Sequence, residues 1–554
     1  MRPATSSNPG RLVFATFGFA CLCGGRNVVN AFALPRLRQY SLSSDPLHVD
    51  PLLVVFTSSL LRKRKRGCAS STIQPLFSTT KPIEIHESAR SVAAMALQKS
   101  KKGMGAAQKL ESLPAFIHLA DQRDRSFARA LVATVERREG QIDKVLALCA
   151  DSTYPPKKGK HAALVQACLR LGAAQLLFLD SPPHAAIKET VDILKMRRPG
   201  QKLPPESMVK FANAVLRRIQ REGKDMLKSQ TSSRDNIEEW LVKEWEECWG
   251  VENANIIADQ SMVEPHIDLS VKIPAHMSSA DALFVLEEMS EQFGDEAAVL
   301  PNGSIRVGLK GAVSSWPQYD EGKWWVQSAA STLPATGLLN ALREGDSNIE
   351  DIHVVDMCAA PGGKTAQLLS AGFGIVTAIE ANARRSRRLF ENLERLQLSD
   401  RCDIVVTEGQ EWQPGSNHDD DDSNIAGILL DVPCSATGTG VRRPDVLRRD
   451  SDLGNLPEVQ EALLNHCADN ILKVGGVLVF STCSLLKRES EDQVQQLLTR
   501  TAGKMVTLPF KKGEIGGFDG AIDENGWLRV LPGVLNEPLN SVDGFFVARL
   551  QKVA

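Results

Sequence analysis

The chain has 554 residues, too many for one ordinary hydrophobic core, which predicts two or three domains with extensions. Its 43% hydrophobic and 24% charged residues are typical of a globular protein, and no run of 18 apolar residues predicts a membrane span in the mature chain. The net charge of −2 argues against a uniformly basic surface, although residues 1–235 are basic and the remainder is acidic. The 11 cysteines show neither disulfide nor CxxC spacing, which argues for reduced thiols and against a metal site.

Residues 1–85 have the composition of a targeting presequence and not of a folded domain. Two arginines precede a short apolar run, residues 12–23, of the length of a signal-peptide hydrophobic region. An Ala31-Phe32 junction follows, and then a segment rich in Ser and Arg and poor in acids. This arrangement resembles the bipartite plastid presequence of algae with secondary plastids and predicts a plastid location. A mitochondrial presequence and a plain disordered tail are the alternatives.

The middle of the chain contains two further predicted domains. Residues 86–235 show apolar side chains at three- and four-residue spacing, which predicts an all-helical domain. Residues 236–325 combine short strand-like and helix-like patterns, which predicts a small α+β domain. Residues 326–554 alternate apolar strands with helices, which predicts an α/β domain of the Rossmann-like type with a mostly parallel, doubly wound sheet.

A glycine-rich turn opens the α/β domain. The turn comprises Cys358, Ala359, Ala360, Pro361, Gly362, Gly363 and Lys364. It follows an apolar strand and leads into a helix, so unpaired helix amides and close-approaching backbone form a cradle for an anionic or carboxylate-bearing cofactor. The spacing fits neither the GxxxxGK[ST] phosphate loop nor GxGxxG.

Three more strands end in reactive or acidic residues. The second strand ends in Glu380, the position at which an acid accepts hydrogen bonds from a ribose diol. The third ends in Asp431, followed by Cys434, and the fourth leads to Cys483. Because the carboxyl ends of parallel strands meet at one sheet edge, these residues predict a single crevice. Two cysteines there indicate nucleophilic chemistry beside a nucleoside cofactor.

These motifs resemble the bacterial Sun/Fmu (RsmB-type) RNA cytosine-C5 methyltransferases. The residues that carry the resemblance are DxCAAPGGKT at 356–365, DVPCSATG at 431–438 with Arg442, Arg443, Arg448 and Arg449 behind it, STCS at 481–484 and DGFFVARL at 543–550. The resemblance implies a class I methyltransferase fold, S-adenosylmethionine as cofactor and 5-methylcytosine in RNA, most simply ribosomal RNA, as product. Phrases at 124–128, 169–179 and 211–218 resemble the NusB-like domain of such enzymes, which implies that residues 86–235 bind RNA and that residues 236–325 form an RNA-binding cap.

The resemblance also assigns a cofactor site. Its residues are the turn from Cys358 to Lys364 together with Glu380, Arg385, Gln410 and Asp431. The turn is assigned to the methionine end, Glu380 to the ribose, and Arg385 to a basic position of the next helix. Gln410 stands where the family commonly has an aspartate at the adenine, and its amide can still form a hydrogen bond to adenine.

Methylation at carbon 5 of cytosine requires a nucleophile at carbon 6 and then a base that removes the carbon-5 proton. Cys434 and Cys483 are the two candidates, and the sequence alone does not choose between them, because a Pro-Cys turn supplies the nucleophile of DNA cytosine methyltransferases. The resemblance assigns attack to Cys483 and product release to Cys434. Asp431 is expected to form a hydrogen bond to the cytosine edge.

Several alternatives remain open at this stage. The chain could be an RNA-binding assembly factor that has lost catalysis, or a transfer RNA methyltransferase. The four arginines behind the Asp431 loop are either a solvated helix face or, as their position favours, phosphate contacts. The acidic segment 415–422 is interpreted as a solvated insertion. RNA is the expected partner, and a monomer is the expected state.

Overall fold

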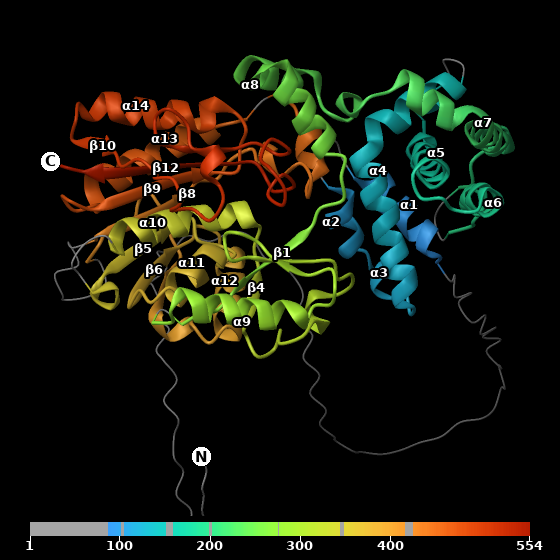
Figure 1. The fold of residues 1–554 in the computed structure, drawn as a ribbon. Helices are drawn as coiled ribbons and strands as arrows, with labels where there is room; N and C mark the ends of the chain where they lie inside the picture. Colours follow the sequence, from blue (N-terminus) through green and yellow to red (C-terminus); the bar gives the residue numbers. More distant parts are fainter. Residues whose placement is uncertain are drawn as a thin grey trace, which may run out of the picture. The chain divides into compact units, whose positions relative to one another are not determined.

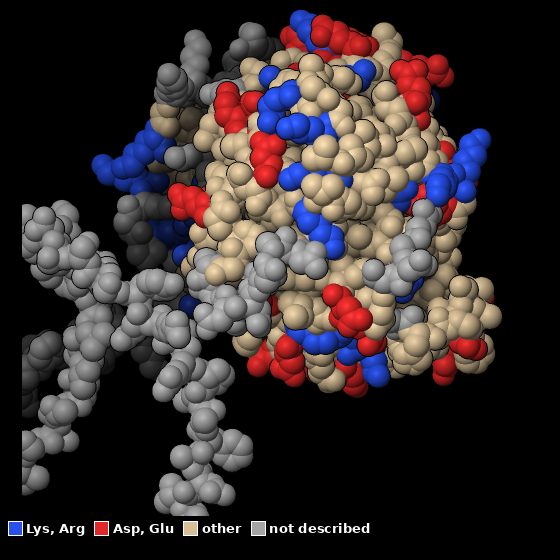
Figure 2. Space-filling model, turned by 90° about the vertical axis from the view of Figure 1, so that its left-hand side faces the viewer, with Lys and Arg blue, Asp and Glu red and all other residues tan. Residues whose placement is uncertain are grey.

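The computed structural model describes residues 87–100, 105–150, 154, 159–198, 202–274, 276–343, 348–415, 425–451 and 453–554. The predicted presequence and most of the acidic segment lie outside these residues. Within them, no helix has both the length and the apolar composition needed to cross a membrane. On the face drawn in Figure 2, Lys and Arg side chains are interspersed with Asp and Glu side chains, so the described residues there form no extended patch of one sign.

The first part of the described chain is all helical. Its helices are α1 (Ala89–Lys99), α2 (Ala106–Glu111), α3 (Pro114–Ile117), α4 (Gln122–Cys149), α5 (Ala162–Leu177), α6 (Pro183–Ile193) and α7 (Glu206–Gln230). Helix α5 is the central one, because nearly all its side chains are buried. Gly172 of α5 allows this packing, since a Cβ there would lie 2.6 Å from the side chain of Leu216 on α7. The long helix α8 (Glu239–Gln260) follows.

A small antiparallel sheet comes next. Its elements are β1 (Ile267–Val271), α9 (Ser279–Glu291), β2 (Ala298–Val299), β3 (Ile305–Val307) and β4 (Trp324–Val326). The strand order is β2-β3-β1-β4. Trp324 is fully buried between this sheet and α9, where its ring meets Phe293 edge to face. This is the small α+β domain that the sequence predicts.

The remaining residues form the α/β domain. Its elements are α10 (Leu333–Arg343), β5 (His353–Met357), α11 (Gly363–Ser370), β6 (Ile375–Ile379), α12 (Ala383–Arg395), β7 (Cys402–Val405), β8 (Gly427–Asp431), α13 (Leu456–His466), β9 (Val477–Thr482), α14 (Glu491–Thr501), β10 (Met505–Thr507), β11 (Leu528–Val530) and β12 (Phe545–Lys552). The strand order is β10-β12-β9-β8-β5-β6-β7, with β11 paired to β12. Strands β7, β6, β5, β8 and β9 are mutually parallel, and β12 is antiparallel. The predicted Rossmann-like fold class is confirmed.

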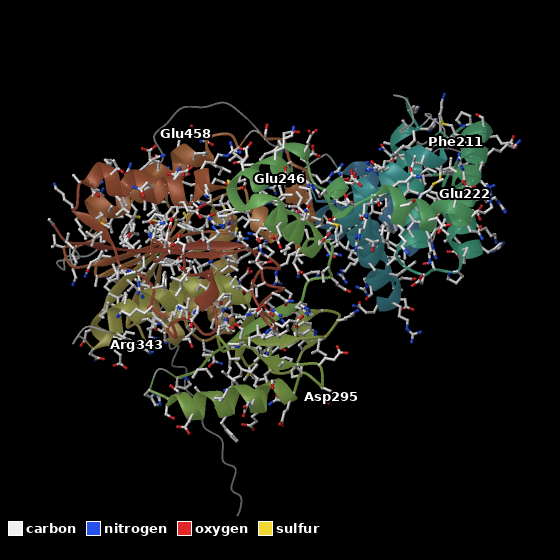
Figure 3. The ribbon with its side chains drawn as sticks, turned by 45° about the horizontal axis from the view of Figure 1, so that its top comes forward. Phe211, Glu222, Glu246, Asp295, Arg343 and Glu458 are labelled. Atoms are coloured by element: carbon white, nitrogen blue, oxygen red, sulfur yellow. The ribbon has the colours of Figure 1, made fainter. Side chains whose placement is uncertain are left out.

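Helices cover both faces of this sheet, as Figure 1 shows. Helices α10, α11 and α12 lie on one face and α13 and α14 on the other. Successive strand residues point to opposite faces of the sheet. Val354 packs in the core beneath α10, α11 and α12, and Val355 packs in the core beneath α13 and α14. Side chains fill the space between the layers, whereas the labelled Arg343 and Glu458 lie at the surface (Figure 3).

The order of the strands determines where a ligand can enter. From β5 the chain winds outward through β6 to β7, and it then returns to β8 on the other side of β5. The direction of winding therefore reverses between β5 and β8. Ligands of open α/β sheets bind at the carboxyl ends of the strands at such a switch point. The glycine-rich turn follows β5 and Asp431 ends β8, so the motif residues lie at this point.

Candidate active site

The glycine-rich turn has a backbone that only some residues can adopt. Cys358 and Gly362 have φ angles of 65° and 101°, in the left-handed region. A Cβ on Gly362 would lie 2.6 Å from a terminal methyl group of Leu389, so a larger residue would also displace that side chain. The Thr365 hydroxyl donates a 2.6 Å hydrogen bond to the buried Asp356, which joins the start of α11 to the end of β5. Burial raises the pKa of Asp356 to about 7, despite this hydrogen bond.

One carboxylate oxygen of Glu380 is available to accept a hydrogen bond from a ribose diol. The side chain is 3% exposed, and its Oε1 accepts a hydrogen bond from the Asn382 amide at 2.9 Å. Its Oε2 is buried and has no hydrogen-bond partner among the described residues. A buried carboxylate oxygen without a donor is costly, and a ribose hydroxyl would satisfy it. The residues at this strand end therefore fit the adenosyl group of S-adenosylmethionine.

Arg385 and Gln410 flank this carboxylate. The Arg385 guanidinium donates to the Ala360 carbonyl at 2.8 Å and lies 3.4 Å from Glu380 Oε1, so it joins the turn to the acid. Gln410 lies in the turn after β7, where the neighbouring Gly409 approaches Met357 of β5 so closely that a Cβ would lie 3.0 Å from its sulfur. The contacts of both residues with the cofactor stay predictions.

Asp431 is held by groups from two neighbouring strand ends. Ser481 Oγ donates to Oδ1 at 2.9 Å, and Lys364 Nζ donates to Oδ2 at 2.7 Å. Burial alone would lower the pKa of Lys364, but the charge and hydrogen bond of Asp431 raise it, so the lysine remains an ammonium. A carboxylate and a cation thus lie together between the turn and the cysteines.

The structure brings Cys434 and Cys483 together, 49 residues apart in sequence, with their sulfur atoms 3.4 Å apart. The hydrogen bond with Cys434 and burial both raise the pKa of the Cys483 thiol, whereas the charge of Lys364 lowers it. Burial likewise raises the pKa of the Cys358 thiol, to about 12, and keeps it protonated. Cys358 therefore lines the turn, as its place in the motif predicts.

Sequence reasoning missed one residue that connects these loops. Glu489 is fully buried, and its carboxylate binds the residue after each cysteine, Ser435 and Ser484. It stands in the run Lys-Arg-Glu-Ser-Glu-Asp at 487–492, whose charge predicts solvent exposure. The local sequence gives no signal of its burial.

The four arginines behind Asp431 have acidic partners among the described residues, and their contacts with phosphates stay a prediction. Arg442 binds Asp543 at 2.8 Å, and Arg443 and Arg449 both bind Asp445, at 3.1 and 3.0 Å. The remaining arginine pairs with two glutamates of the helical region: Arg448 lies 3.6 Å from Glu139 and 3.8 Å from Glu238. These ion pairs neutralise neighbouring acids and hold the loop after Asp431 in place.

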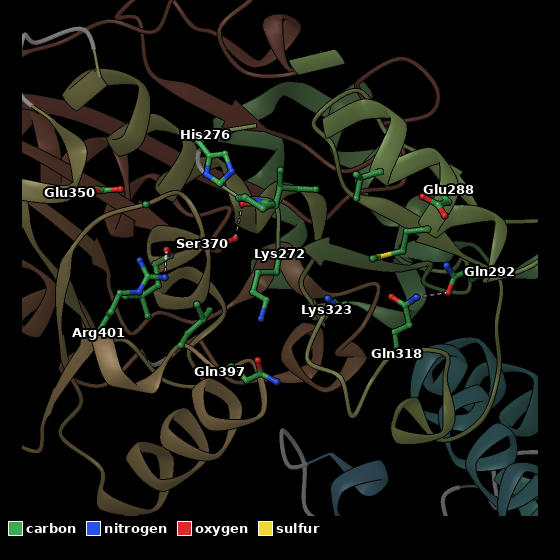
Figure 4. Close-up of a pocket in the computed structure, with 17 residues that line it drawn as sticks. Lys272, His276, Glu288, Gln292, Gln318, Lys323, Glu350, Ser370, Gln397 and Arg401 are labelled. Carbon is green, nitrogen blue, oxygen red and sulfur yellow. Dashed lines mark hydrogen bonds between the residues drawn. The ribbon is translucent and has the colours of Figure 1, made fainter. Parts of the chain in front are cut away.

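A large pocket of about 650 Å³ lies away from these groups (Figure 4). Three of its lining residues, Glu350, Gly372 and Arg401, precede β5, β6 and β7, so it lies at the opposite edge of the sheet from the motifs. Its cations also have structural partners: Lys272 donates to the Leu396 carbonyl at 2.7 Å, and Arg401 to the Leu369 carbonyl at 3.0 Å. The position of the cysteines, and not the size of this pocket, identifies the candidate active site.

Comparison with known proteins identifies two families. The model described as 16S rRNA methyltransferase RsmB/F matches residues 346–551, and that of the NusB family matches residues 87–221. Ribosomal RNA small subunit methyltransferase B of Shewanella oneidensis is 32% identical over 447 residues, 78% of this chain and 92% of the relative. The protein of the same name from Cronobacter sakazakii is 31% identical over 479 residues, 84% of this chain and 98% of the relative.

A solved structure has the same fold. The crystal structure of PH0851 superposes with a TM-score of 0.61 at 20% identity, covering 84% of this chain and 99% of that one. The helical domain, the parallel sheet and the motif order agree with the family matches. The chain therefore belongs to the RsmB/F family of RNA methyltransferases, with a NusB-family domain before the catalytic domain and S-adenosylmethionine as methyl donor.

Proposed function

We propose that this protein methylates carbon 5 of a cytosine in ribosomal RNA, with Cys483 as the nucleophile and Cys434 as the group that releases the product. One observation carries the proposal: two thiols lie 3.4 Å apart, beside a carboxylate that is paired with an ammonium. Catalysis by a cysteine nucleophile needs a neighbouring group that can accept or donate a proton, and a second thiol at this distance can do so.

The chemistry follows from what each side chain can reach. The Cys483 thiolate adds to carbon 6, and the displaced π electrons make carbon 5 nucleophilic. S-adenosylmethionine, which the turn from Cys358 to Lys364 and Glu380 would hold, would supply an electrophilic methyl group to carbon 5 and would leave as a neutral thioether. Cys434, as a thiolate, then removes the carbon-5 proton. The electrons of that C–H bond restore the carbon 5–carbon 6 double bond, and the bond to Cys483 breaks.

Asp431 is assigned the cytosine edge. Its carboxylate can accept a hydrogen bond from the exocyclic amine, and Lys364 and Ser481 fix its direction. A base stacked in a helix cannot reach this group, so the target must be flipped out or lie in a single-stranded loop, at a cost of a few kcal/mol in a duplex. A structured RNA with an exposed cytosine satisfies this requirement.

Separate alanine variants of the two cysteines test the proposed roles. Cys483→Ala should abolish methylation with cofactor binding intact, because it removes only the attacking sulfur. Cys434→Ala should still attack and transfer the methyl group, and should then stall as a protein–RNA adduct that survives denaturing electrophoresis. Cys402→Ala, a thiol outside the crevice, is the matched control. An adduct in Cys483→Ala but not in Cys434→Ala would mean that the roles are exchanged.

The RNA substrate needs its own experiment. We would compare organellar RNA from cells with and without the protein by bisulfite sequencing. One ribosomal RNA cytosine should be methylated in cells with the protein and unmethylated in cells without it. A lost methyl group in transfer RNA alone would assign the other substrate. Unchanged methylation in both RNAs, together with no transfer from labelled cofactor in vitro, would contradict cytosine methylation altogether.

A further inference from the structure

A single carboxylate lies beneath both cysteine-bearing loops. Glu489 Oε1 accepts hydrogen bonds from the Ser435 amide at 2.9 Å and from Gln460 Nε2 at 3.1 Å. Its Oε2 accepts hydrogen bonds from the hydroxyls of Ser435 and of Ser484, the latter at 2.6 Å. Four donors therefore replace the water that burial removes from this carboxylate, and both of its oxygens are occupied.

The two serines have equivalent places in the chain. Ser435 directly follows Cys434 at the end of β8, and Ser484 directly follows Cys483 at the end of β9. Their hydroxyls lie 3.1 Å apart, close to the 3.4 Å that separates the two sulfurs. The contact between the loops at the serines thus parallels the contact at the thiols, and Glu489 is the group that both serines share.

The two loops depend on Glu489 unequally. The Cys483 loop has further supports, because Arg529 donates to the Ser484 carbonyl at 2.8 Å, and the Leu485 amide donates to Thr437 at 2.9 Å. Trp249 of α8 also donates to the Leu485 carbonyl at 3.0 Å.

The Cys434 loop also has supports of its own, because Gln460 donates to the Pro433 carbonyl at 2.9 Å and Arg449 to the Ser435 carbonyl at 3.1 Å. Glu489 accepts hydrogen bonds from both the amide and the hydroxyl of Ser435, whereas it accepts only the hydroxyl hydrogen bond of Ser484. Because loss of the Glu489 carboxylate removes two hydrogen bonds from the residue after Cys434 and one from the residue after Cys483, it should displace Cys434 more than Cys483.

We propose that Glu489 is a positioning residue that keeps Cys434 within proton-transfer distance of the group attached to Cys483. This inference rests on the proposed function, in which Cys483 attacks and Cys434 releases. Attack needs only Cys483, whereas product release needs the Cys434 loop and the Cys483 loop in their correct relative positions. Glu489 would therefore affect release more than attack.

Glu489→Gln tests the proposal with little change of shape. Turnover should fall about tenfold or more, because a buried hydrogen-bond network loses an acceptor. The covalent protein–RNA adduct should accumulate, as in Cys434→Ala, and binding of S-adenosylmethionine should stay within about twofold of the unaltered protein, because no cofactor residue is changed. Glu489→Asp, which keeps the charge but shortens the reach, should restore part of the release.

A general loss of stability is controlled with another buried carboxylate of the same domain. Glu514 binds the buried Arg549 and the Lys511 amide, and it has no part in the cysteine loops. Glu514→Gln should lower the melting temperature without adduct accumulation. If Glu489→Gln also lowers the melting temperature without adduct accumulation, and its activity falls with its stability, Glu489 supports the fold only. The inference is then overturned.

A second readout does not depend on methyl transfer. Phenylarsine oxide bonds to two adjacent thiols and releases water, so peptide mapping of the full chain should find it across Cys434 and Cys483. The rate of this crosslink should fall about tenfold in Glu489→Gln and stay unchanged in Glu514→Gln. An unchanged rate in Glu489→Gln would refute the positioning role. If Cys434→Ala forms no adduct although the arsenical result is as expected, the proposed cysteine roles fail while the placement by Glu489 stands.

Discussion

The thiol that we propose as the nucleophile lies in surroundings that favour its protonated form. The hydrogen bond with Cys434 and burial raise the pKa of Cys483 above its ordinary value. The Lys364 ammonium acts in the opposite direction, because a nearby positive charge stabilises a thiolate. Attack therefore requires loss of a proton that the free protein retains at neutral pH.

This argument predicts a pH dependence. Because a raised pKa leaves a small thiolate fraction at neutral pH, the single-turnover rate of attack should increase about tenfold per pH unit between about pH 7 and 9. Lys364→Met removes the charge that lowers the pKa, so its profile should shift to higher pH; Lys504→Met, at an exposed site, should leave the profile in place. Rapid-quench measurement of adduct formation gives both profiles. A rate independent of pH in this window would show that the thiolate is already formed.

The loop after β8 is the element on which the site depends most. Gly438 donates its amide hydrogen bond to the Cys483 carbonyl at 2.9 Å and accepts one from Gly544 at 2.8 Å. A Cβ at Gly438 would lie 2.5 Å from the Gly544 carbonyl oxygen and 2.7 Å from that of Cys483. Only a glycine allows these three backbone segments to meet.

Gly438→Ala should therefore separate the cysteine loops. We expect a loss of roughly 1–3 kcal/mol of unfolding free energy, as for overpacking elsewhere, together with a larger loss of methylation than of cofactor binding. Gly520→Ala is the control, because its Cβ would meet only a flexible leucine side chain at 3.3 Å. Denaturant unfolding and calorimetric cofactor titration measure the two effects. Normal methylation by Gly438→Ala would show that the loops can separate without consequence.

The elements also show what the sequence could predict. The turn after β5 and the acid after β6 were predictable, because their chemistry depends on residues adjacent in the chain. Glu489 was not, because its three partner residues come from three separate segments and its own neighbours are charged. The same holds for α8: Leu241 and Trp245 belong to the same hydrophobic core as Leu485 of the cysteine loop, an association that no local periodicity indicates.

At the scale of the whole molecule, we propose that the protein acts in a plastid after removal of its N-terminal segment. Residues 1–85 lie outside the described structure, and their basic, Ser-rich composition provides no core of its own. N-terminal sequencing of the native protein should find a start near Phe32 or just after Arg66. An intact Met1, or a protein located outside organelles, would contradict the targeting proposal.

The segment that follows Cys434 is supported by every domain of the described chain. Arg137 of α4 donates to the Val441 carbonyl at 3.2 Å, Trp240 of α8 donates to the Arg449 carbonyl at 2.9 Å, and Arg442 donates to the His266 carbonyl at 2.8 Å, just before β1. The domain boundary near residue 325 is thus a boundary in sequence only. A catalytic domain expressed without the preceding domains would keep the reactive cysteines but would lose the residues that support their loop. We therefore expect the three domains to be needed in one chain.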